Sequence, residues 1–64
     1  MDLDLVVRRV RAEFSEMPGL RLTPAQASRL LGLEQEICQA ALDALIANAF
    51  LRRTHAGQIT RADQ

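Results

Sequence analysis

Apolar residues recur at helical spacing over the first part of the chain. The apolar residues of this stripe are Leu3, Val6, Val7, Val10, Phe14 and Met17. Charged residues fill most of the positions between them. A stripe with this period is typical of an amphipathic helix that buries one face. The pattern predicts a first helix over about residues 2–16, capped by Asp2 or Asp4. Met17-Pro18-Gly19 would end it, because proline disfavours the α conformation of the residue before it.

Several start signals for a second helix coincide at Thr23. Threonine is a good N-cap, Pro24 suits the first helical position, and Gln26 completes a capping-box pattern. Gly32 would end this helix in the left-handed conformation. The residues expected to face inward are Ala27, Leu30 and Leu31, and those expected to be more exposed are Gln26, Ser28 and Arg29.

A longer apolar stripe predicts a third helix from about Glu34 to Asn48. Its breadth indicates a helix that lies across the core. The positions expected to face inward are Ile37, Cys38, Ala41, Leu42, Leu45, Ile46 and Ala49. The opposite face carries Gln35, Glu36, Gln39, Ala40 and Asp43.

The remaining sequence has the residue types of short strands and a tight turn. Residues 50–54 and 58–61 are predicted to form a hairpin, with Gly57 at the left-handed position of the turn. A hairpin this thin is not stable alone, so it must pack on the helices. The segment Leu20-Arg21-Leu22 is a candidate to pair beside it as a short third strand.

Length and composition limit the classes of protein to consider. A chain of 64 residues forms one domain at most, and it buries only about 60% of its unfolded surface, which favours a simple helix-rich core. Eight acidic and eight basic residues give no net charge, so any electropositive patch must be local. One cysteine and one histidine exclude an internal disulfide and a structural zinc site. No long apolar run suggests secretion or membrane insertion, so a cytoplasmic location is expected.

The order helix, short strand, helix, glycine turn, helix, hairpin resembles that of winged helix-turn-helix domains of the small bacterial transcription-regulator kind. The resemblance covers about residues 20–61. Its motifs are Leu22-Thr23, Ala27-Ser28, Leu31-Gly32-Leu33, Cys38 with Leu42 and Leu45, and Phe50-Leu51-Arg52-Arg53. It implies a mainly α fold with a small β-hairpin, a three-helix winged helix-turn-helix over residues 1–64 with its helix-turn-helix at about 23–48 and its wing at about 50–61. Ala49 replaces the family's usual glycine before the wing, and Asn48 is expected to take the left-handed position instead.

The resemblance implies a transcription regulator that binds double-stranded DNA. The third helix would enter the major groove, and the wing would hold phosphates. The residues that would face bases are Gln35, Glu36 and Gln39, joined at the margin by Ala40 and Asp43. Those that would face phosphates are Arg29, Arg52, Arg53, His55 and Arg61.

The charge pattern keeps a second function open. No basic residue lies between Leu30 and Leu51, whereas three acidic residues do: Glu34, Glu36 and Asp43. An acidic helix is repelled by a polyanion, so one copy would bind DNA weakly and a homodimer would add two weak contacts. The alternative is a protein-protein interaction module that presents the acidic helix or the first helix to a partner.

An enzyme is not expected. Catalysis needs a pocket and convergent titratable groups, whereas His55 stands alone in a predicted turn and Cys38 is predicted to be buried. The sequence therefore predicts neither a cofactor nor a metal.

Overall fold

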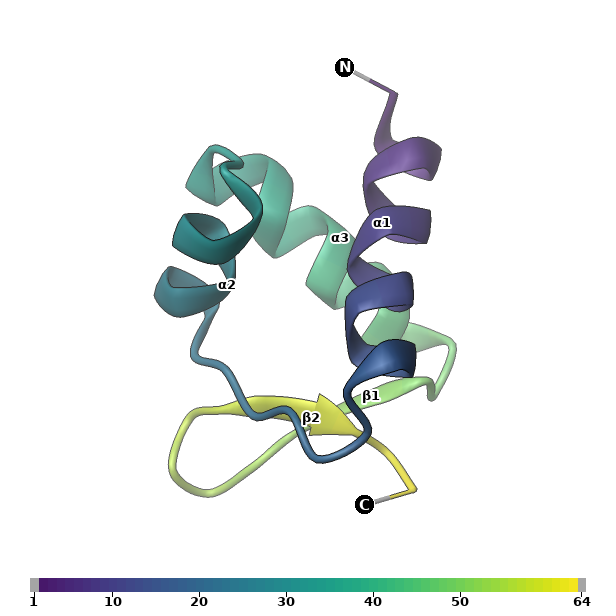
Figure 1. The fold of residues 1–64 in the computed structure, drawn as a ribbon, viewed down its shortest axis with the longest axis vertical. Coiled ribbons are helices and arrows are strands. Elements are labelled where there is room, and N and C mark those ends of the chain that lie inside the picture. Colours follow the sequence, from purple (N-terminus) through teal and green to yellow (C-terminus); the bar gives the residue numbers. More distant parts are fainter. Residues whose placement is uncertain (1, 64) are drawn as a thin grey trace.

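Three helices and one antiparallel hairpin make up the computed structural model, which describes residues 2–63. The elements are α1 (Leu3–Glu16), α2 (Pro24–Leu31), α3 (Gln35–Ala47), β1 (Leu51–Arg53) and β2 (Ile59–Arg61). Figure 1 shows α1 and α2 on either side of α3, with the hairpin across the lower ends of the helices. The predicted fold class, mainly α with a small β-hairpin, is confirmed.

The helix ends are set by the residues that the sequence indicated. The Asp2 side chain accepts a hydrogen bond from the Asp4 N–H and caps α1. At α2 the Thr23 hydroxyl accepts from the Gln26 N–H, and the Gln26 side chain accepts from the Thr23 N–H, which completes the capping box. Gly32 ends α2 with φ of 64°, in the left-handed region.

The core lies where the three helices and the hairpin meet. α3 contributes its inward stripe, and α1 and α2 pack their apolar faces against it. Side chains that are almost fully buried include Val10, Phe14, Ala27, Cys38, Ala41, Leu42, Leu45, Leu51 and Ile59. The hairpin residues in this set show why so thin a hairpin is stable here, since its apolar face is covered by the helices.

β2 is paired on both of its sides. β1 pairs with it in an antiparallel register that sets Leu51 opposite Arg61 and Arg53 opposite Ile59. On the other side Leu22 forms an isolated antiparallel bridge with Ile59. The Leu22 nitrogen lies 3.0 Å from the Ile59 carbonyl oxygen, and the Ile59 nitrogen lies 2.6 Å from the Leu22 carbonyl oxygen. The predicted pairing of the segment before α2 with the hairpin is thus confirmed as one bridge.

The predicted exposure of two residues of α2 was wrong. Ser28 is buried, and its hydroxyl donates a hydrogen bond to the Leu33 carbonyl, whereas the Leu30 side chain is 53% exposed. The buried face of α2 is centred on Ala27, Ser28 and Leu31, which leaves Leu30 on its flank. The polar Ser28 is buried because the chain folds back after Gly32 and brings a carbonyl within its reach.

The end of α3 also differs from the prediction. Asn48 keeps a φ of −92°, and Ala49 takes the left-handed conformation with φ of 66°. The Asn48 side chain instead accepts a hydrogen bond from the Phe50 N–H at 3.1 Å. Ala49 is therefore exposed rather than part of the inward stripe, because the helix ends at Ala47.

Candidate nucleic-acid interface

The three residues predicted to face bases lie together on the outer face of α3. Gln35 and Glu36 are exposed and Gln39 is half-buried. Their position on the outer face follows from the helical period, because the residues of α3 that face the core leave this side of the helix to solvent. All three line one hollow, whose other lining residues are Pro24, Ala25, Ala40 and Asp43.

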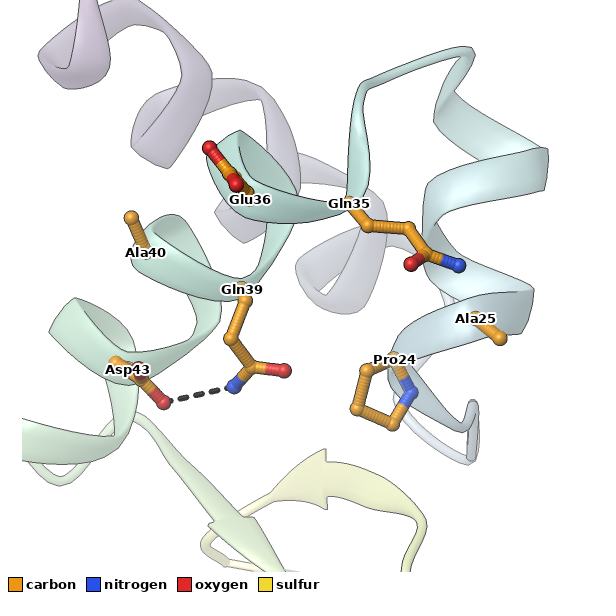
Figure 2. Close-up of a pocket in the computed structure, with 7 residues that line it drawn as sticks. All are labelled: Pro24, Ala25, Gln35, Glu36, Gln39, Ala40 and Asp43. Carbon is orange, nitrogen blue, oxygen red and sulfur yellow. Dashed lines mark hydrogen bonds between the residues drawn. The ribbon is translucent and has the colours of Figure 1, made fainter.

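This hollow has a volume of about 630 Å³ and lies between α3 and the start of α2. Figure 2 shows Gln35 and Gln39 extending from α3 on the side that faces Pro24, while Glu36 points away from them. The hairpin runs below the hollow in the same view. The site thus has one wall from each helix of the α2–α3 pair.

A polar network links the outer face of α3 to the hairpin. The Gln39 side-chain amide donates a hydrogen bond to the Asp43 carboxylate at 2.9 Å (Figure 2). The same carboxylate oxygen lies 3.6 Å from the Arg53 guanidinium in β1. Arg53 is therefore held beside the hollow, and its charge is partly offset by Asp43.

The other residues predicted to face phosphates occupy different surroundings. Arg29 is exposed in the last turn of α2, four residues after Ala25 and so on the same face of that helix. Arg52 is exposed in β1, and His55 is exposed in the turn between the strands. None of these three lines the hollow.

Arg61 belongs to a separate cluster on the hairpin. Its guanidinium donates to the Asp63 carboxylate at 2.9 Å and lies 5.6 Å from the centroid of the Phe50 ring. Arg11 of α1 lies over the same ring at 4.8 Å. The structure thus places Arg53 near the predicted base-facing residues and Arg61 with Phe50 and Arg11.

Three residues of these sites were not predicted from the sequence. Pro24 and Ala25 form a wall of the hollow, and their place at the start of α2 is a local signal that could have indicated this. Arg11 stacks on a residue far along the chain, and no local pattern in the sequence indicates such a contact.

The chemistry available in the hollow is hydrogen bonding. Two amides supply donors and acceptors, two carboxylates supply acceptors, and the lining has no basic side chain. Cys38 is buried, and burial raises the pKa of its thiol, so it stays protonated and unreactive at neutral pH. Within residues 2–63, no three His, Cys, Asp or Glu side chains gather closely enough to hold a metal ion.

Two wider observations complete the description of the chain. Among residues 2–63, none of the helices has the length and apolar character needed to cross a membrane. No known protein family, curated protein or solved structure matches this chain.

Proposed function

We propose that this chain is a winged helix-turn-helix module that binds double-stranded DNA and acts in transcription regulation. The observation that carries the proposal is the hollow on the outer face of α3, which is lined by Gln35, Glu36 and Gln39 and by the start of α2. The order of three helices followed by a hairpin is the order of that class of domain. Arg53 beside the hollow and Arg29 on α2 supply positive charge at its margins.

In this proposal α3 lies in the major groove. A glutamine amide can pair with adenine through two hydrogen bonds, and a carboxylate can accept from cytosine, which are the roles of Gln39 and Glu36. Gln39 already donates to Asp43, so a bidentate contact to a base requires this bond to open. Arg53 would then leave Asp43 for a phosphate, and Arg52 and His55 in the hairpin would add contacts to the backbone.

The acidic residues of α3 limit the affinity that we expect for DNA. Glu36 and Asp43 repel a polyanion, so we expect weak binding by one copy, and any decrease of affinity with salt comes from the phosphate contacts of the arginines. Two copies on neighbouring half-sites would add their contacts.

The test is a titration of isotope-labelled protein with mixed-sequence duplex DNA at low and at moderate salt. We expect chemical-shift changes at Gln35 and Gln39 at low salt, which weaken as salt is added. Arg53→Gln should reduce the slope of log affinity against log salt by about 1. Arg9→Gln, an exposed arginine of α1 outside the hollow, is the matched control and should keep the slope. The absence of shifts at low salt would overturn the proposal.

A protein-protein interaction module is the second candidate. It is favoured by the lining of the hollow, which holds two carboxylates and no basic group and so suits a basic segment of a partner. Asp43→Asn separates the two functions, because the lost charge should strengthen binding to DNA and weaken binding to a basic partner.

A further inference from the structure

Arg11, Phe50 and Arg61 form a cluster that the proposed base-reading face does not use. Arg11 comes from α1, Phe50 from the segment between α3 and β1, and Arg61 from β2. The two guanidinium carbons lie 4.8 and 5.6 Å from the same ring centroid, so they are no farther apart than the sum of these distances. Both distances are within the range of a cation–π contact.

The Phe50 ring restricts both arginines. Stacking on an aromatic face limits where a flexible guanidinium can lie, so less side-chain entropy is lost when it binds an anion. Phe50 is itself half-buried and packs against the core. The cluster therefore presents two cations from different elements on one fixed support.

An anionic group already occupies this cluster. The Asp63 carboxylate accepts a hydrogen bond from the Arg61 Nη2 at 2.9 Å, and the Asp63 side chain is 63% exposed. Within residues 2–63, no carboxylate lies at ion-pair distance from Arg11. The internal anion thus pairs with Arg61 and not with Arg11, and its carboxylate marks a position beside Arg61 that an anionic oxygen can take.

Arg53 and Arg61 are diagonal neighbours on the hairpin. The register sets Arg53 opposite Ile59 and Arg61 opposite Leu51, so the Cα atoms of the two arginines are about 7–8 Å apart. Leu51 and Ile59 belong to the same face of the hairpin and are buried. The hairpin therefore carries two separate basic positions, Arg53 beside the hollow and Arg61 with Arg11.

We propose that Arg11 and Arg61, supported by Phe50, bind a phosphodiester of the DNA backbone, and that Asp63 occupies this site in the free protein. The inference rests on the proposed DNA binding and extends it to α1. Asp63 would act as an internal competitor, because a phosphate must displace its carboxylate from Arg61. Arginine suits this role, since its planar guanidinium can donate two parallel hydrogen bonds to a phosphate.

The test compares four variants in salt titrations with the duplex used for the unaltered protein. Arg11→Gln should lower the slope of log affinity against log salt by about 1, as expected for one lost phosphate contact. Arg9→Gln removes the same charge from the same helix without a contact to Phe50 and should leave the slope unchanged. Asp63→Asn should strengthen binding by about two- to fivefold, the range expected for an exposed ion pair. Glu16→Gln, an exposed acid of α1, controls for the change in net charge and should have a smaller effect.

The outcomes separate this inference from the function on which it rests. A gain of affinity in Asp63→Asn cannot arise from loss of folding, so it supports the site even where Arg11→Gln is destabilised. Equal slopes for Arg11→Gln and Arg9→Gln, or equal affinities for Asp63→Asn and Glu16→Gln, would overturn the inference while DNA binding stands. No binding at low salt by the unaltered protein and by Asp63→Asn would overturn both.

Discussion

Asp43 on the outer face of α3 and Arg53 in β1 lie 3.6 Å apart, so one ion pair joins the proposed reading helix to the hairpin. Both side chains are more than half exposed, and such surface pairs contribute about 0–1 kcal/mol to stability. The pair therefore matters more for the charge that a ligand meets than for the fold. It keeps Arg53, which lies beside the hollow, engaged with an acid.

Asp43→Asn should raise the affinity for duplex DNA by about two- to fivefold, because it removes a repulsive charge and releases Arg53. The melting temperature should change by only a few degrees, since the pair is exposed. Affinity is measured by titration at low salt and stability by thermal unfolding. Glu16→Gln gives the effect of net charge alone, and a decrease in affinity for Asp43→Asn would contradict the proposed role of Arg53.

Ala49→Gly should stabilise the protein. A non-glycine residue in the left-handed region costs about 1–2 kcal/mol, and the flexibility that glycine adds to the unfolded chain offsets about 0.5–1 kcal/mol of the gain. The net gain is on the order of 0.5–1 kcal/mol, which should raise the melting temperature by several degrees.

The control for this variant is Ala47→Gly, at the last residue of α3. Ala47 is exposed and helical, so glycine there should lower stability by about 0.5–1 kcal/mol. Effects of the same sign in the two variants would show that the conformation of Ala49 is not the cause.

Ser28→Ala should destabilise the protein by about 1–3 kcal/mol, because the Leu33 carbonyl would lose its buried side-chain donor. The measurement is urea unfolding followed by far-ultraviolet circular dichroism. Ser15→Ala, on the exposed side of α1, makes the same chemical change without a buried partner and should be close to neutral. A loss of the same size in both variants would rule out the Ser28 contact as the reason.

The stability of the protein should fall at alkaline pH because of Cys38. Burial raises the pKa of this thiol above its ordinary value of 9.0, so the unfolded chain loses the thiol proton at a lower pH than the native one does. The contribution of the protonated Cys38 thiol to the free energy of unfolding is therefore complete below pH 9.0, and it decreases as the pH rises towards the native pKa. The sequence has neither lysine nor tyrosine, so no other side chain with an ordinary pKa near 10 adds to the change in stability over this pH range.

Urea unfolding at pH 8 and pH 10 measures this loss, and Cys38→Ala should remove most of it. Reaction of Cys38 with a thiol reagent at pH 8 should also be slow in the native protein and fast in urea. Native and urea-unfolded protein that react at the same rate would contradict the burial of this thiol.

Local signals in the sequence were enough to predict the helices and the turn glycines. Thr23 and Gln26 define the start of α2 through bonds within a few residues, and Gly32 and Gly57 take the left-handed conformations expected of them. These features depend on neighbours in the sequence, so the pattern contains the information. The outer face of α3 was predictable for the same reason.

The features that were not predicted depend on contacts between distant elements. Arg11 stacks on Phe50, and Asp43 reaches Arg53, only because α1 and α3 pack beside the hairpin. Ala49 adopts an unfavourable conformation that local propensity assigns to Asn48, since the chain must leave α3 towards β1 at this residue. Tertiary packing decided these contacts, and at Ala49 it also overrode the local preference.

The bridge between Leu22 and Ile59 has a mechanical consequence for the hollow. Leu22 directly precedes the cap of α2, so its two hydrogen bonds to β2 fasten the hairpin to the helix end that forms one wall. The hairpin therefore cannot swing away from α2 without breaking both bonds. We expect a rigid recess whose width is set before a ligand arrives, which lowers the entropy that is lost on binding and favours partners that already have the right shape.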